Sequence, residues 1–282
     1  MSEERENLKI QRILVALDAS PHSLAALEAA ADLAASFDAE LIGLFVEDVN
    51  LLRLADLPFT REIGLFSARR RQIEIHEVER QLRGQARRVR RTFAVVTQRM
   101  EVHGTFRVAR GAITSKLLDA AADADMIILG RAGWSPSRRR QMGSTARAVA
   151  LESSALTVVL QDGTRLCSPI MLIYGDSPLA QKALAVAAHL VKEETEWAFN
   201  VVALAEDSEE AERLENEAAE WLKGHELSVE YYPVIGEPIP RLRRLIGQRC
   251  GTLILPADSA LLRDEYLATL LEEVEVPVMI VR

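Results

Sequence analysis

The sequence has few of the features that mark stapled scaffolds or membrane proteins. Only two cysteines, Cys167 and Cys250, occur in 282 residues, too few and too far apart for a disulfide framework or a tetrahedral zinc site. No run of 18 or more apolar residues is present, so no transmembrane helix is expected. The start, MSEERENLK, lacks the basic residues and apolar stretch of a signal peptide. We therefore expect a cytoplasmic protein that does not insert into membranes.

An excess of positive charge is also missing, because the net charge is −8. Residues 1–160 hold 23 basic and 20 acidic residues, whereas residues 161–282 hold 11 and 22. An acidic half repels phosphate backbones, so nucleic acid is not expected as a partner. The arginine clusters at 69–71 and 87–91 fall in a helical pattern, and we interpret them as a solvated helix face.

Known catalytic signatures are absent as well. There is no G-x-x-x-x-G-K-[ST] loop, and ASPHS stands after the first expected strand, where a G-x-G-x-x-G turn or a Ser-Gly-Gly run would be needed. No two of the five histidines have metal-ligand spacing on one helix. His22 is the histidine near the site proposed below, and we interpret it as a helix-surface residue. We therefore expect no catalytic residue and no metal site.

What is present is an alternation of strand and helix signals, the pattern of a parallel α/β sheet. In the first half the pattern predicts strands at 12–17, 40–46, 99–103, 125–129 and 156–160, and helices at 21–36, 67–93, 113–122 and from 144. In the second half it predicts strands at 170–174, 197–204, 227–234, 252–255 and 276–281, and helices at 178–191, at 207–223 and from 236–238. The order of elements is the same in both halves.

This repetition indicates an internal duplication. The two Ser-Pro turns, at Ser20 and Ser177, lie 157 residues apart. We predict an α/β protein with two Rossmann-like domains, at 1–161 and 169–282, joined by a short polar linker at 162–168. Each domain is expected to be a five-stranded parallel sheet flanked by helices.

Ligands of open parallel sheets bind at the carboxyl ends of the strands, near the point where the strand order reverses. Asp18 follows the first strand, and its carboxylate would accept hydrogen bonds from a ribose hydroxyl or an amine. Gly130 and Gly133 follow the fourth strand, and Gly143-Ser144 stands at the next helix start. Such glycines let a backbone approach a ligand, and free helix amides suit a phosphate. We favour this interpretation over ordinary turn glycines and an ordinary N-cap serine, because three spaced glycines plus serine seldom coincide here by chance.

The segment GRAGWSPSRRRQMGST matches the G-x2-G-x9-G-[ST] signature of the universal stress proteins. VALDASPHSLAALEAA, LFVED and VARGAITSKLLDAAADADMIILG resemble other segments of that family, so the resemblance spans residues 9–161. The resemblance implies a sheet of the HUP type that binds ATP, AMP or ADP, with or without Mg²⁺. A tandem, two-domain member is the arrangement that the duplication suggests.

The resemblance also implies roles for particular residues. Asp18 would lie beside the adenosine, and Val46, at the end of the second strand, would offer backbone contacts to adenine. The ribose and phosphates would be held by Gly130, Gly133, Gly143 and Ser144. Thr145-Ala146 follows where many members read Val-Thr, so either one phosphate contact is missing or Thr145 supplies it from a shifted position.

The second half resembles the family in outline only. Gly175 stands opposite Asp18, and the segment after the fourth strand reads Pro-Ala-Asp-Ser, with no glycine beyond Gly251. We therefore expect no ATP site in this half. We expect it to pack on the first half as an intramolecular mimic of the family's homodimer, with 156–160 and 276–281 as the pairing strands. Further dimerisation is left open.

Three functions are weighed against one another: a nucleotide-binding stress or signalling module, a slow ATPase using the same pocket, and a ligand-free scaffold. The glycines and Ser144 favour the first over the scaffold, and the absent base and nucleophile favour it over the ATPase. Two features are left open. The arginines at 138–140 are either a solvated loop, which we favour, or a clamp on the triphosphate, and the segment 49–93 either covers the pocket or forms an interface.

Overall fold

The computed structural model describes residues 9–56, 61–63, 70–72, 75–131, 142–160, 164–193, 198–236, 238–259 and 274–282. The elements of the first half are β1 (Arg12–Leu17), α1 (Pro21–Ser36), β2 (Glu40–Asp48), α2 (Val49–Asp56), β3 (Arg61–Ile63), β4 (Arg70–Gln72), α3 (Ile75–Arg99), β5 (Gly104–Gly111), α4 (Ile113–Ala121), β6 (Met126–Gly130), α5 (Ser144–Glu152) and β7 (Leu156–Leu160). Those of the second half are β8 (Ile170–Tyr174), α6 (Pro178–Glu193), β9 (Phe199–Ala205), α7 (Ser208–Leu222), β10 (Val229–Ile235), α8 (Pro238–Arg249), β11 (Thr252–Pro256) and β12 (Val278–Val281).

The main strands form one ten-stranded sheet in the order β10-β9-β8-β11-β12-β7-β6-β1-β2-β5. Within each half all neighbouring strands are parallel. The halves meet where β7 and β12 run antiparallel, with Val159 opposite Val278. The expectation that the last strand of each half is the pairing edge is confirmed. Strand order reverses between β1 and β6 in the first half, and between β8 and β11 in the second.

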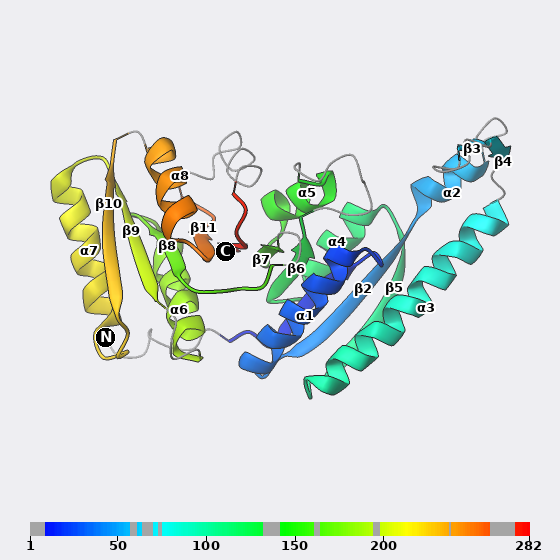
Figure 1. Ribbon diagram of the computed structural model, residues 1–282, viewed down its shortest axis with the longest axis horizontal. Coiled ribbons are helices and arrows are strands. Elements are labelled where there is room, and N and C mark those ends of the chain that lie inside the picture. The colour runs from blue at the N-terminus through cyan, green and yellow to red at the C-terminus, as the bar shows by residue number, and fades with distance from the viewer. Residues whose placement is uncertain are drawn as a thin grey trace.

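Helices cover both faces of this sheet, and the strands alternate their side chains between two apolar layers. One layer packs α1, α3, α6 and α7 against one face, and the other packs α4, α5 and α8 against the opposite face. In β1, for example, Ile13 and Val15 join the first layer, while Leu14 joins the second. Strands buried on both faces need the continuous apolar runs that the sequence shows. Figure 1 shows the two halves side by side, with α2, β3 and β4 together at one end of the long helix α3.

The two halves also touch outside the sheet. The ring of Phe37, at the end of α1, stacks on His189 of α6 with centroids 4.2 Å apart. Arg282 donates to the side chain of Thr157 and to backbone carbonyls of α5. The Arg165 guanidinium, between the halves, donates to the Glu28 carboxylate of α1 at 2.6 Å. The two halves are thus joined outside the sheet by a stacked ring pair and by hydrogen bonds from two arginines.

The turn after β1 follows the chemistry of its residues. Ser20 caps α1 by accepting a hydrogen bond from the Ser23 amide at 3.2 Å, and Pro21 occupies the first helical position. Ala19 has a φ of 65°, a left-handed conformation that costs a non-glycine residue some strain. The predicted helix start is confirmed, but the strained residue before it was not expected.

Three predicted elements are wrong, all between residues 49 and 111. A helix, α2, follows β2 directly, where a loop was expected. A two-stranded antiparallel pair, β3–β4, precedes α3, which therefore begins at Ile75 rather than near 67 and continues to Arg99. The third strand of the sheet is β5, at Gly104–Gly111, instead of 99–103.

The reason for the misplaced strand is its position at the edge of the sheet. Among the described strands β5 pairs with β2 alone, and its residues are half-buried or exposed, so it lacks the apolar run of an inner strand. Its register is set by packing: a Cβ at Gly104 would come within 2.7 Å of Thr97 and 3.0 Å of Phe93, both on α3. Glycine is needed where strand and helix approach so closely.

One expected helix cannot be compared with the structure. It would lie between the last two strands of the second half, on residues 260–273, which are outside the described residues. Within the described part of the chain, no helix combines the length and the hydropathy needed to span a bilayer.

Candidate functional site

Strand register brings three of the predicted site residues to one edge of the sheet. β1 pairs with β2 so that Leu17 lies opposite Phe45, which places Asp18 level with Val46 on the next residue of each strand. β1 pairs with β6 so that Val15 lies opposite Ile128, which places Gly130 level with Leu17. The carboxyl ends of β2, β1 and β6 thus meet at the reversal point between β1 and β6, where open parallel sheets bind ligands.

Asp18 forms a turn that aims the chain into α1. Its Oδ1 accepts a hydrogen bond from the Ser20 amide at 2.9 Å, and the left-handed Ala19 between them closes the turn. The side chain is half-buried. The carboxylate therefore has a fixed orientation at the end of β1.

Gly130 is the point where β6 passes under the first turn of α1. A Cβ at this position would come within 3.1 Å of His22 Cβ and 3.3 Å of the His22 backbone. Any larger residue would push β6 and α1 apart, so glycine keeps the reversal point narrow. His22 lies beside the site, with its backbone and Cβ packed against Gly130.

The start of α5 lies beside the same strand end. Gly143 is the N-cap of α5, and its amide donates to the Arg131 carbonyl at 2.8 Å, while the Arg131 amide donates to Leu160 of β7. Gly143 provides no side-chain cap, so the first amides of α5 lack the usual acceptor. Ser144 is exposed and Thr145 half-buried in this first turn. Such a helix start favours an anion.

Part of the glycine-rich segment lies outside the described residues. Gly133, Trp134 and the arginines at 138–140 belong to the stretch 132–141, whose placement is not described. The two interpretations of those arginines therefore both stand. The structure brings together Asp18, Val46 and Gly130, and places Gly143, Ser144 and Thr145 at the start of α5.

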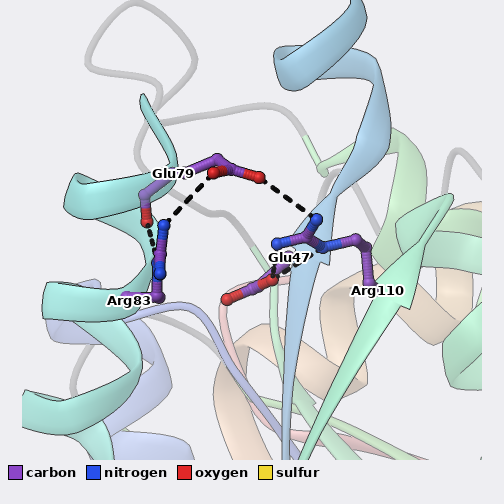
Figure 2. A network of polar contacts seen from close by, with 4 residues as sticks. All are labelled: Glu47, Glu79, Arg83 and Arg110. Carbon is purple, nitrogen blue, oxygen red and sulfur yellow. Dashed lines mark hydrogen bonds and ion pairs between the residues drawn. The ribbon is translucent and has the colours of Figure 1, made fainter. Parts of the chain in front are cut away.

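A charged network that the sequence analysis missed lies next to Val46. Figure 2 shows Glu47 of β2 beside Arg110 of β5, with Glu79 and Arg83 of α3 facing them. Arg110 donates to Glu47 at 2.9 Å, and it bonds Glu79 at 3.3 Å, which in turn pairs with Arg83 at 3.1 Å. The Glu47 hydrogen bond, above all, raises the pKa of the Arg110 guanidinium.

This network ties the start of α3 to the ends of β2 and β5. Glu47 is buried, with 8% of its surface exposed, and it lies directly opposite Arg110 in the strand pairing. Asp48, the next residue, accepts a hydrogen bond from the Asn50 amide and so begins α2. The signal available in the sequence was the two acidic residues that end the apolar segment LFVED. Val46 packs against the apolar layer, and the residue that follows it is fixed in an ion pair with Arg110.

The sequence profile of the universal stress protein family matches residues 9–160, which is more than half of the chain. The chain belongs to the universal stress protein family. The solved structures include a universal stress protein from Archaeoglobus fulgidus, with 19% identity, a TM-score of 0.72 and 97% of each chain covered. They also include a functionally unknown protein from Pseudomonas aeruginosa, with 11% identity, a TM-score of 0.56, and 96% and 92% of the two chains covered. These similarities show a shared fold. A comparison with curated protein sequences gave no significant match.

The second half of this universal stress protein repeats the backbone of the site but not its chemistry. The Ala257 amide donates to Val281 at 2.8 Å, just as the Arg131 amide donates to Leu160 in the first half. This match places Pro256, a residue with no amide hydrogen, where the first half has Gly130. The family's glycines are thus replaced at the corresponding reversal point.

A carboxylate occupies the helix start at that second reversal point. Asp258 accepts hydrogen bonds from the Ser177 hydroxyl at 2.5 Å and from the Leu179 amide at 3.3 Å, at the beginning of α6. In the first half the helix after β1 is capped by its own Ser20. In the second half the corresponding helix is therefore capped by a carboxylate from the end of β11.

Proposed function

We propose that this universal stress protein binds one adenine nucleotide, ATP or its AMP or ADP counterparts, in the first half of the chain. The observation that carries the proposal is the placement of Asp18 level with Val46, with Gly130 one residue behind them, near the carboxyl ends of three adjacent parallel strands and beside a helix start without a side-chain cap. Such an edge offers a carboxylate, strand backbone and helix amides together. A nucleotide presents the matching ribose hydroxyls, purine edge and phosphates.

Each residue has a role that suits its chemistry. The Asp18 carboxylate would accept hydrogen bonds from the ribose hydroxyls, and the Val46 backbone would bind the purine edge. The hydroxyls and amides of Ser144 and Thr145 would hold phosphate oxygens, because the start of α5 carries positive potential. Gly130, with Gly133 and Gly143, would leave room for the ligand. Mg²⁺, where a triphosphate is bound, would be held mainly by the phosphates.

The second half supports a count of one site per chain. Pro256 stands where the first half has Gly130, and the Asp258 carboxylate, at the same end of the sheet, would repel a phosphate. We propose that this half acts as the intramolecular counterpart of a second subunit, joined through β7 and β12. Its contribution would be to the sheet and the core.

The test begins with the protein as purified, which is denatured so that any released nucleotide can be identified by chromatography and mass spectrometry. About one adenine nucleotide per chain is expected. Titration calorimetry with ATP then compares Asp18→Asn with Asp176→Asn, a carboxylate two residues after the end of β8. Asparagine keeps an oxygen for the Ser20 amide, so the turn survives, while charge-assisted bonds to the ribose are lost.

We expect Asp18→Asn to weaken ATP binding roughly 10- to 100-fold, as the loss of a hydrogen bond to a charged group implies, and Asp176→Asn to leave it unchanged. Two nucleotides per chain would contradict the silent second half. No released nucleotide and no ATP binding by calorimetry would overturn the proposal and favour the ligand-free scaffold. Mg²⁺-dependent phosphate release that Asp18→Asn abolishes would instead add ATPase activity to the same site.

A further inference from the structure

The two cysteines, 83 residues apart in the sequence, lie beside each other in the fold. Cys167 belongs to the segment that leads into β8, and Cys250 stands two residues before β11. Both positions are at the amino ends of these neighbouring strands, the edge opposite the reversal point. This pair is independent of the nucleotide site proposed above.

The backbones on either side are in direct contact. The Cys167 amide donates to the Thr252 hydroxyl at 2.9 Å, and that hydroxyl donates to the Cys167 carbonyl at 2.9 Å. The Gly251 amide donates to Pro169 at 2.7 Å. A Cβ at Gly251 would come within 2.5 Å of the Cys167 carbonyl oxygen. Glycine therefore permits an approach that any other residue would prevent.

The Cys167 side chain is directed at the backbone that directly follows Cys250. Its thiol donates to the Gly251 carbonyl at 3.4 Å, which is the residue bonded to Cys250. Cys167 is exposed, whereas Cys250 is half-buried, and both are free thiols. An exposed thiol next to a protected one is the arrangement in which one cysteine meets an oxidant and the other resolves the product.

We propose that Cys167 and Cys250 are a reversible oxidation site that forms an intramolecular disulfide when the protein meets a hydroperoxide. In the first step the Cys167 sulfur attacks the peroxide O–O bond, giving Cys167 sulfenic acid and an alcohol or water. In the second step the Cys250 sulfur attacks the sulfenic sulfur, the S–S bond forms, and the hydroxyl leaves as water with the Cys250 proton. Two electrons pass from the thiols to the peroxide, and a dithiol reductant reverses the change.

The order of the steps follows from the surroundings. Burial, with a smaller contribution from nearby Cys167, raises the pKa of the Cys250 thiol to about 12, so at neutral pH it is almost entirely protonated and reacts slowly. Oxidation therefore begins at Cys167. The resulting bond would join the segment entering β8 to the start of β11.

The experiment uses the full chain, reduced, freed of reductant and then treated with hydrogen peroxide. The intact mass is expected to fall by two hydrogens, and trypsin under non-reducing conditions is expected to release the peptides 166–182 and 250–263 as one linked species. Dithiothreitol is expected to restore the original mass. A product in which Cys167 carries only sulfenic or sulfinic acid, or is linked to a second chain, would overturn the proposal.

Two variants separate the steps. Cys250→Ala, a small apolar replacement for a half-buried thiol, is expected to stop at Cys167 sulfenic acid, which dimedone traps. Cys167→Ser, a substitution at an exposed position, is expected to show no loss of two hydrogens at the same peroxide dose. A linked species in either variant, or oxidation of Cys250 in Cys167→Ser at the wild-type rate, would refute the assigned order.

Discussion

Gly251 is the position where a single methyl group tests the packing of the second half most directly. A Cβ there would lie 2.3 Å from the Ser168 carbonyl oxygen and 2.5 Å from that of Cys167. Both distances fall well below the 3.0 Å that real Cβ contacts essentially never cross. The atoms in the way are backbone, so no side chain can rotate to relieve the clash, and the two segments must separate.

The cost of that separation is set by the bonds that hold the segments together. The Thr252 hydroxyl makes two hydrogen bonds to Cys167, and the amides of Gly251 and Thr252 both donate to Pro169. Each contributes about 0.5–1.5 kcal/mol, and overpacking of a dense interior costs about 1–3 kcal/mol. We therefore expect Gly251→Ala to lower the free energy of unfolding by about 2–4 kcal/mol, since not all of these bonds need be lost.

Gly247→Ala is the matched control, four residues earlier in α8. A Cβ at Gly247 would meet nothing within 4 Å, and alanine in an exposed helix is favoured over glycine by about 0.8–1 kcal/mol. Urea unfolding followed by circular dichroism is expected to move the two midpoints in opposite directions. A Gly251→Ala variant within about 0.5 kcal/mol of the wild type, the usual range of neutral substitutions, would refute the close contact.

Two further predictions concern charges. Arg165 lowers the pKa of Glu28, chiefly through its hydrogen bond, and a lowered carboxyl pKa gives stability above its unfolded-state value that is lost as pH falls through the folded-state value. Arg165→Ala should therefore destabilise the protein at pH 7 by less than about 1 kcal/mol, because the pair is solvent-screened. The urea midpoints of variant and wild type should converge as the pH falls through the lowered pKa of Glu28; an undiminished gap at low pH would contradict the pairing. Asp258→Ala removes the cap of α6 and should cost about 1 kcal/mol in the same assay, while Asp258→Asn, which keeps an acceptor oxygen, should cost less; equal losses would argue against a capping role.

The sequence by itself determined the elements whose signals are local. β1, α1, β7 and β8 have the predicted bounds, because a continuous apolar run marks a strand buried on both faces and Ser20-Pro21 marks a helix start. The family signature and the two-fold repetition of elements were also readable, since both depend on residue order alone. The same holds for Asp18, which follows β1, and for Gly130, which is the last residue of β6.

Only the tertiary structure decided the features that depend on partners distant in the chain. The register of β5, an edge strand without an apolar run, is set by β2 and by the approach of Gly104 to α3. The Glu47–Arg110–Glu79 network joins three elements, and nothing local in the sequence pairs those residues.

The second half likewise has some features that the sequence determines and others that only the tertiary structure decides. That it lacks the family's glycines is plain in the sequence, but that Asp258 reaches the start of α6 is a matter of packing. The cysteines, interpreted as isolated because they are 83 residues apart, are brought together by the pairing of β8 with β11. Sequence patterns report which face of an element is buried, whereas contacts between elements arise from parallel pairing across the whole sheet, which no local pattern encodes.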